Sequence, residues 1–290
     1  MVCNGRSERM IRPGIIASAR RRSAVSYDSE AQTYFTEVEG RTGSVGSGKK
    51  SGINEFILYM RDTGPSGNQW QHLERLWLYD NSSEIAALTS IKNPTAPISE
   101  AINSPSFTAD GGYSFNGTSS YIKTKYNPST DSVLLQTEDH ASGIIWEQTG
   151  VASDLPLEIA AGCDDGTNQY FIAPDNQNFG TIYNPCRAVG AGYGMGNTGV
   201  SSGTNSYFQG RTAGGGMKFY QSNVGASTNS GASGGGLPNK EIYLGAYNQN
   251  GTANFFWNRG GNRQNIKVYF LARYAINFAE LDYAIRTYLL

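Results

Sequence analysis

The run 163–168, CDDGTN, holds the side chains best suited to metal chemistry. Its adjacent carboxylates, Asp164 and Asp165, and the amide of Asn168 could offer oxygen ligands to Ca²⁺, which takes roughly six to eight. Aspartate and asparagine also fill ordinary turns, because their side chains hydrogen-bond to the nearby backbone. We expect a hydrated turn here and no metal ion, with calcium at Asp164 and Asp165 as the alternative.

The sequence contains no recognisable arrangement of residues for acid–base or nucleophilic catalysis. His72 and His140 lie in different regions, and neither has a neighbouring residue that suggests a catalytic or metal site. Glu147 and Glu158 could form the carboxylate pair of a glycoside hydrolase, but nothing in the sequence fixes their separation. The glycine-rich run 190–196 lacks the strand and helix that frame a phosphate-binding loop, and no known catalytic motif occurs. The sequence therefore predicts neither an enzyme nor a cofactor.

The three cysteines, Cys3, Cys163 and Cys186, are odd in number and widely spaced. Such a pattern indicates neither a disulfide framework nor a metal site. Cys163 and Cys186 could pair if they lay on neighbouring strands. Buried thiols are the expectation, and the pairing stays open.

The composition favours a β-rich protein that acts through its surface. The chain has 290 residues, a formal net charge of −1, 36 glycines and 18 tyrosines, and 16% of its residues are charged. A near-neutral charge gives no general attraction to nucleic acid. No apolar run approaches the roughly 20 residues of a membrane-spanning helix, and the N-terminus lacks the apolar core of a secretory signal. We expect a soluble protein made in the cytoplasm, with no membrane span and no specific nucleic-acid partner.

Residues 1–27 are basic, with six arginines against a single acid, Glu8. One interpretation is a solvated tail, because a segment of this composition cannot bury enough apolar surface to fold alone. The other is an extended arm that becomes ordered on a partner. Its only apolar patch would then supply anchors, and its arginines would pair with carboxylates or phosphates. The candidate partner-binding residues are Arg12, Ile15, Ile16, Arg20, Arg21 and Arg22.

Residues 28–95 are predicted to form a small helical region that packs on the rest of the protein. Asp28 or Ser29 can cap a helix over residues 28–39, where apolar residues recur at helical spacing. A second helix is expected over residues 49–61, ended by the Gly64-Pro65 pair. Short helical turns over residues 68–75 and 83–90 and a buried strand over 76–79 complete the region.

Residues 96–290 are predicted to form an antiparallel β-sandwich closed by a C-terminal helix. Residues 105–127 carry an Asn116-Gly117 turn between two short strands, a pattern typical of a β-hairpin. The glycine- and serine-rich run 222–236 is predicted to be a mobile loop. The final helix, residues 277–290, has Asn277 as its cap and Glu280 at the position that reaches back in a capping box. The further strands are expected over residues 141–148, 157–161, 169–173, 180–183, 207–211, 217–221, 241–246, 253–257 and 266–274.

A resemblance to a known family adds to these patterns. The run 114–129, SFNGTSSYIKTKYNPS, resembles the F-x-G-T-S-S-Y signature of concanavalin A-like (laminin-G-like) jelly-roll domains. More narrowly, the order of several segments is similar to that of tailed-bacteriophage and prophage structural proteins with this domain. The resemblance covers residues 28–290 and implies a jelly-roll body in a virion component, with no catalytic residues to carry over. The matched segments are residues 31–38, 53–60, 70–79, 92–94, 101–110, 242–252 and 279–289.

Three functions follow, in order of expectation. The first is a non-enzymatic structural protein of the virion (tail, fibre, portal-proximal or capsid-decorating) that docks through its arm and works in many copies. The second is an adhesin that binds host surface glycans, with Tyr183 and Trp257 as candidate stacking residues if they are exposed, although a core or interface position is expected for each. The third, a glycan-cleaving enzyme, has the least support. Fold alone does not decide among them.

Overall fold

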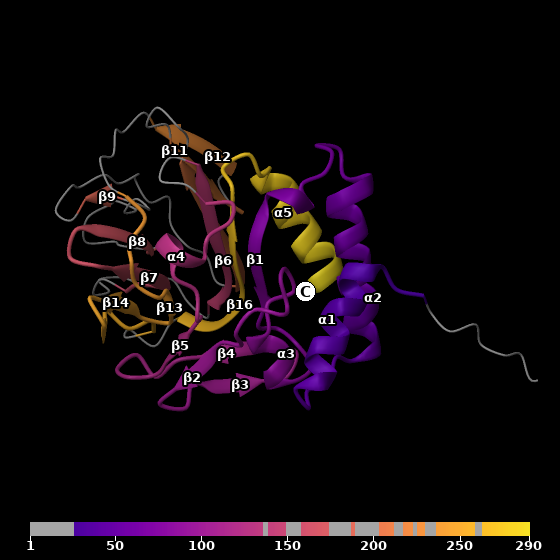
Figure 1. The fold of residues 1–290 in the computed structure, drawn as a ribbon, viewed down its shortest axis with the longest axis horizontal. Coiled ribbons are helices and arrows are strands. Elements are labelled where there is room, and N and C mark those ends of the chain that lie inside the picture. Colours follow the sequence, from indigo (N-terminus) through magenta and orange to yellow (C-terminus); the bar gives the residue numbers. More distant parts are fainter. Residues whose placement is uncertain are drawn as a thin grey trace, which may run out of the picture.

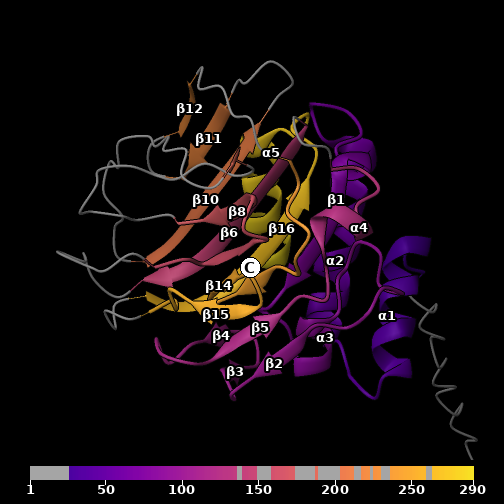
Figure 2. The ribbon, with the colours of Figure 1, turned by 60° about the vertical axis from the view of Figure 1, so that its left-hand side comes forward.

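The computed structural model describes residues 26–135, 139–148, 158–173, 187–188, 203–211, 217–222, 225–229, 236–258 and 263–290. In this part the chain forms two β-sheets with helices against one of them (Figures 1 and 2). The expected mainly β sandwich with a C-terminal helix is confirmed. Among the described residues, no helix is long and apolar enough to cross a membrane.

The first sheet, sheet A, is antiparallel throughout its described strands. Its central strand β16 (Arg263–Ala272) is flanked by β6 (His140–Gln148) on one side and by both β1 (Leu73–Leu78) and β4 (Gly112–Ser114) on the other. Its strands in spatial order are β12 (Gly225–Asn229), β11 (Met217–Gln221), β10 (Gly203–Arg211), β6 (His140–Gln148), β16 (Arg263–Ala272), β4 (Gly112–Ser114) and β3 (Ser106–Thr108), with β1 (Leu73–Leu78) also on β16.

The second sheet, sheet B, faces one side of sheet A. Its pairs are antiparallel except for β14 and β7, which run parallel. Its strands in spatial order are β15 (Thr252–Asn254), β14 (Tyr247–Gln249), β7 (Ala161–Asp164), β13 (Tyr243–Leu244), β5 (Tyr121–Lys123) and β2 (Glu100–Ile102), with β8 (Asn168–Ile172) on β7 and β9 (Arg187–Ala188) on β8.

Sheet A is buried on both faces, so the described chain has three layers. Alternate residues of a strand point to opposite faces. On β16, Tyr269 and Leu271 pack into the core between the sheets, whereas Val268 and Phe270 pack into a second core beneath the helices. Figure 1 shows sheet B on one side of β6, β16 and β1, and the helices α1 (Ser29–Gly40), α2 (Ser47–Leu58) and α5 (Phe278–Ala284) on the other.

The helical layer begins close to where the sequence predicts it. Helix α1 (Ser29–Gly40) starts at Asp28, whose side chain accepts a hydrogen bond from the backbone N–H of Glu30, and it buries the expected apolar stripe. Helix α2 (Ser47–Leu58) continues into the π-helical turn η1 (Tyr59–Thr63). The remaining helical segments of this layer and of the loops are η2 (Trp70–His72), α3 (Glu84–Leu88) and α4 (Pro128–Asp131).

The first strand binds this helical region into the sandwich. β1 pairs with β16 from Leu73 to Leu78, three residues earlier than the strand expected over residues 76–79. The helical region therefore contributes a strand to sheet A in addition to packing on it.

The hairpin expected around Asn116 is wrong. The turn forms, with Gly117 at φ +74° and Asn116 Oδ1 accepting from the backbone N–H groups of Thr118, Ser119 and Ser120. However, β4 before the turn belongs to sheet A and β5 after it belongs to sheet B. The segment is thus a crossing between sheets, and the local hairpin is instead formed by β3 and β4.

Two other expectations in the β region are corrected. Within the run 222–236, predicted to be a loop, β12 pairs with β11 along its whole length. The strand expected over residues 157–161 begins only at Ala161, as β7. The strand predicted over 180–183 lies outside the described residues.

The C-terminal helix packs in the helical layer, against sheet A. Helix α5 (Phe278–Ala284) is capped by Asn277, whose side chain accepts from the N–H of Glu280, and it continues into the π-helical turn η3 (Ile285–Leu289). The predicted cap at Asn277 is confirmed, but the predicted hydrogen bond from the Asn277 N–H back to the Glu280 side chain is wrong. Glu280 accepts from the N–H of Ser66 instead of reaching back, and the N–H of Asn277 donates to Gln69.

Candidate functional site

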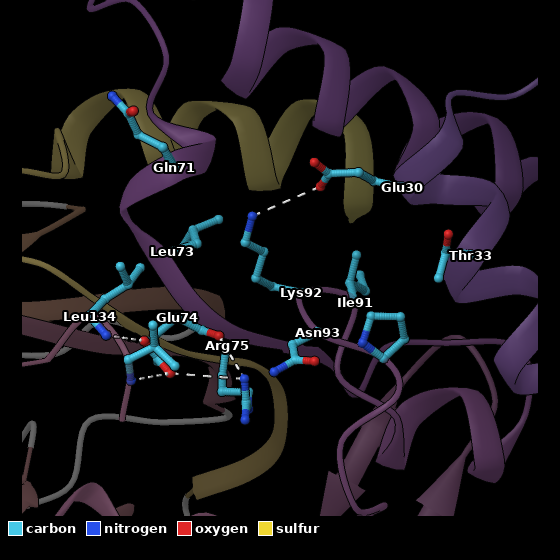
Figure 3. Close-up of a pocket in the computed structure, with 12 residues that line it drawn as sticks. Glu30, Thr33, Gln71, Leu73, Glu74, Arg75, Ile91, Lys92, Asn93 and Leu134 are labelled. Atoms are coloured by element: carbon cyan, nitrogen blue, oxygen red, sulfur yellow. Dashed lines mark hydrogen bonds and ion pairs between the residues drawn. The ribbon is translucent and has the colours of Figure 1, made fainter. Parts of the chain in front are cut away.

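An open cavity of about 470 Å³ lies beside the first turn of α1 (Figure 3). Its walls come from α1, from β1 and the turn before it, and from two loop segments. The lining residues are Glu30, Thr33, Gln71, Leu73, Glu74, Arg75, Ile91, Lys92, Asn93, Pro94, Val133 and Leu134. Its volume is within the range of small-molecule and side-chain pockets, about 300–1,000 Å³.

Two consecutive charged residues of β1, Glu74 and Arg75, are buried at the base of this cavity, 4% and 8% exposed. The Glu74 carboxylate accepts hydrogen bonds from the backbone N–H of Val133 at 3.2 Å and of Leu134 at 2.7 Å. Arg75 donates to the Glu74 carbonyl at 3.1 Å, and its guanidinium lies 5.2 Å from the centre of the Tyr126 ring. Buried charges need such partners to offset lost hydration. Glu74 therefore holds the segment at residues 133–134 against β1.

A second charged pair lies where the cavity meets α1. The Lys92 ammonium lies 3.9 Å from the Glu30 carboxylate and 4.4 Å from the centre of the Trp70 ring. Glu30 also accepts a hydrogen bond from the Trp70 indole N–H. Burial lowers the pKa of Lys92, and the charges of Glu30 and Glu74 oppose that shift. The lysine stacks on the indole as a cation–π pair, which fixes its position.

The cavity presents a fixed cation beside apolar side chains. Its acids accept hydrogen bonds from the protein itself, and its walls are otherwise largely apolar. Val133, at its edge, is 84% exposed. Such a surface can accept an apolar side chain next to a fixed cation.

These residues were not predicted from the sequence, although one signal was present. The run 73–78, LERLWL, places two charged residues inside an otherwise apolar strand. Charged residues in a strand buried on both faces must have specific partners. The sequence does not say that those partners come from residues 133–134.

The acidic run 163–168 is a turn between β7 and β8. Asp164 accepts from the Gly166 N–H and from the Tyr247 hydroxyl. Asp165 accepts from the N–H groups of Thr167, Asn168 and Asn239. Their oxygens therefore serve the turn and its neighbours, as the first interpretation predicts. No group of three or more candidate metal ligands occurs among the described residues.

The other sequence-predicted residues are placed as follows. Trp257 is fully buried and packs edge-to-face on Trp146, with ring centroids 6.0 Å apart, so its proposed role as an exposed glycan platform is wrong and the core position is correct. Cys163 is buried on β7. Tyr183, Cys186 and the arm residues Arg12, Ile15, Ile16, Arg20, Arg21 and Arg22 lie outside the described residues.

The two glutamates considered for glycoside hydrolysis are each engaged elsewhere. Glu147 forms an ion pair with Lys267 at 3.2 Å and accepts from the Thr204 hydroxyl. Glu158 is fully buried and accepts from the Asn258 N–H. Neither lines the cavity.

Comparison with solved structures finds proteins of similar fold. No protein-family model and no curated protein matches the chain. The structure of the HCR/D W1238A mutant aligns over 74% of this chain and 52% of its own, with 8% identity and a TM-score of 0.52.

Two further counterparts are more distant. Domain 4 of AbnA, a GH43 extracellular arabinanase from Geobacillus stearothermophilus, aligns over 73% of this chain and 98% of its own (11% identity, TM-score 0.43). Trypanosoma rangeli sialidase aligns over 75% and 33% (9% identity, TM-score 0.43). The chain thus spans about half of the HCR/D chain and a third of the sialidase chain. At these identities the likeness concerns the fold alone.

Proposed function

We propose that this protein is a non-enzymatic structural component of a tailed-bacteriophage particle, attached through its N-terminal arm. In this role the arm binds other virion proteins and the β-sandwich is a rigid module carried in many copies. The virion assignment rests on the sequence resemblance. The structural support is the way the base of the arm is held.

That base, residues 26–28, is held by three separate contacts. The Tyr27 ring packs edge-to-face on Phe35 at 5.1 Å. The backbone N–H of Asp28 donates to Asn54 at 2.7 Å, and its carboxylate pairs with Arg61 at 3.0 Å. An arm that carries a module on a particle must be tied firmly to that module. Tyr27 therefore belongs to the folded body, and the arm proper ends before it.

The layer that holds this base is continuous with the sandwich. α1 and α2 cover sheet A, and β1 from the same region pairs with β16. A force applied through the arm is passed to the sheet through backbone hydrogen bonds and a shared core. This arrangement suits a protein that acts by contact.

Deletion of residues 2–25 tests the proposal. The truncated protein is expected to keep the circular dichroism spectrum and unfolding midpoint of the full chain, but to be lost from particles purified after complementation of a phage lacking the gene. A full-length variant with the arm residues scrambled is the matched control, and it separates sequence recognition from net charge. Incorporation of the truncated protein at the normal level would refute the arm's role.

A carbohydrate-binding role is the second candidate, and one observation favours it. Tyr121 on β5 and Phe256 are half-buried, with ring centroids 6.4 Å apart, and Tyr121 also contacts Tyr243 at 4.7 Å. Tyr121 alternates with Ile122 of the core, so its ring lies on the outer face of sheet B. Binding to a glycan array that is abolished by Tyr121→Ala but kept by Tyr121→Phe would support this role. An array with no bound glycan would count against it.

A further inference from the structure

The cavity beside the first turn of α1, which we call the Lys92 cavity, is entered by one lysine side chain. Figure 3 shows Lys92 extending into it toward Glu30. The Lys92 ammonium lies 3.9 Å from the Glu30 carboxylate, which is beyond hydrogen-bond distance. Among the described residues this ammonium group donates no hydrogen bond, although it carries three donors. The two side chains are 24% and 40% exposed, so a ligand in the cavity can reach both.

The charged residues that line the Lys92 cavity form two pairs. At its base, Glu74 and Arg75 lie 4.0 Å apart. Nearer α1, Lys92 faces Glu30, which accepts one hydrogen bond from the Trp70 indole and, as a carboxylate, can accept more. The described lining therefore carries no net charge, and a charged ligand attracted by one member of a pair is repelled by the other. The ligand that fits is neutral, with an acceptor for Lys92 and a donor for Glu30.

The rest of the lining is largely aliphatic. Val133, at the edge of the cavity, is the most exposed of the large apolar residues in the described chain. Of the twelve described residues that line the cavity, none is aromatic, so a sugar ring would find no aromatic face to stack on. A volume of about 470 Å³ has room for a branched aliphatic side chain and the peptide groups beside it. The aliphatic lining residues are Leu73, Ile91, Pro94, Val133 and Leu134.

We propose that the Lys92 cavity binds a leucine-like residue of a partner polypeptide in an extended conformation. The side chain of that residue would lie among the aliphatic lining residues, its C=O would accept from Lys92, and its N–H would donate to Glu30. An extended residue presents its N–H and C=O on the same side of the backbone, as in paired antiparallel strands, so it suits two groups 3.9 Å apart. The inference goes beyond the proposed function, because this contact is on the folded body and requires neither the arm nor a particle.

Titration of the full-length protein with N-acetyl-leucine N-methylamide tests the site. This probe supplies a leucine side chain between two peptide groups and has no net charge. The NMR signals of the methyl groups of Ile91, Val133 and Leu134 report binding at the cavity. We expect these signals to shift with a Kd on the order of 1 mM, which is usual for so small a ligand.

Two related probes identify the chemistry that the cavity recognises. N-acetylglycine N-methylamide keeps the peptide groups and lacks the side chain, whereas 4-methylpentanoate keeps the side chain and carries a carboxylate. Each is expected to bind roughly tenfold more weakly, because the first buries less apolar surface and the second is repelled by Glu30. Glu30→Gln removes that repulsion and should strengthen binding of the carboxylate probe.

One variant and its matched control identify Lys92 as the donor. Lys92→Met keeps an unbranched side chain on the Trp70 ring but removes the ammonium group, and it should weaken binding of the leucine probe about tenfold, the effect of losing a charged hydrogen bond. Lys50 is likewise paired with a glutamate, Glu39, at 2.6 Å and lies over an aromatic ring, Phe35, at 5.2 Å, but it does not line the cavity. Lys50→Met should therefore leave the Kd unchanged. The unfolding midpoint of each variant is measured alongside, and the comparison of probes on the wild-type protein decides the question even if Lys92→Met is unstable.

Equal affinity for the leucine and glycine probes would overturn the inference. So would tighter binding of 4-methylpentanoate, an unchanged Kd in a folded Lys92→Met variant, or cavity signals that do not shift at concentrations well above the expected Kd. Binding that appears only after deletion of residues 2–25 would also overturn it, because the chain's own arm would then fill the cavity. The titration uses isolated protein, so its failure leaves the particle experiment standing. Conversely, normal incorporation of the arm-deleted protein would refute the arm's role and leave the measured Kd unchanged.

Discussion

Trp77 of β1 and Tyr269 of β16 lie directly opposite each other in sheet A, with their rings stacked at 5.5 Å and 17°. Such cross-strand aromatic pairs stabilise a sheet beyond the area they bury. Trp77 belongs to the N-terminal helical region and Tyr269 to a late strand of the sandwich. The pair therefore joins the two parts of the chain within one core.

Trp77→Ala is expected to destabilise the protein by about 3–5 kcal/mol, the usual cost of deleting a large buried aromatic side chain. Urea unfolding followed by fluorescence and circular dichroism measures the change. Val133→Ala, at a residue 84% exposed, is the control and should change stability by less than about 0.5 kcal/mol. If the helical region and the sandwich form one unit, both probes show a single transition, and two separated transitions would contradict this.

Asn116→Ala should destabilise the crossing between the sheets. The side-chain oxygen accepts hydrogen bonds from three backbone N–H groups, which lose this acceptor when the side chain is removed. We expect a loss of about 1–2 kcal/mol in the free energy of unfolding, since the turn is partly exposed. Asn116→Asp keeps the acceptor and should recover most of the loss. Equal losses for the two variants would show that the hydrogen bonds do not stabilise the turn.

Asp28 should make stability depend on pH. Burial opposes its charge, but hydrogen bonds from Arg61 and the Glu30 N–H outweigh that effect, so its pKa lies below the ordinary value of 3.8. A group with a lowered folded-state pKa stabilises the fold above its unfolded-state pKa. That contribution is lost as the pH falls through the folded-state pKa.

The difference in unfolding free energy between wild type and Asp28→Asn should therefore be present at neutral pH and decrease as the pH falls below the ordinary aspartate pKa of 3.8. Asparagine also caps helices well, so this variant isolates the charge. Asp28→Ala additionally removes the cap and should cost about 1 kcal/mol more. Urea titrations from pH 2.5 to pH 7 measure both effects, and a difference that grows toward low pH would contradict the assignment.

Trp257→Ala should lower the free energy of unfolding, and we expect no direct effect on glycan binding. Its indole is fully buried against Trp146, so we expect a loss of about 3–5 kcal/mol. Thermal and urea unfolding measure it. An unchanged unfolding midpoint combined with lost glycan binding would restore Trp257 as a ligand-contacting residue. Tyr121→Ala is the matched comparison, because its ring is on the outer face of sheet B.

The sequence by itself determined the elements that are stabilised by interactions between residues close together in the chain. Asp28 and Asn277 cap α1 and α5 where the cap residues predict, because a cap bonds to N–H groups only two or three residues ahead. β6 and β16 also lie close to their predicted positions. The alternation of core residues on β16 follows from the geometry of one strand.

Only the tertiary structure decided which elements meet. Asn116 and Gly117 form the same turn whether the flanking strands pair with each other or enter opposite sheets, so the choice depends on distant partners such as β16 and β13. Glu74 is stabilised by N–H groups about sixty residues away, and Glu280 accepts from Ser66 across the helical layer. Long-range contacts of this kind follow from the packing of the whole chain, and neither composition nor periodicity encodes which residues they join.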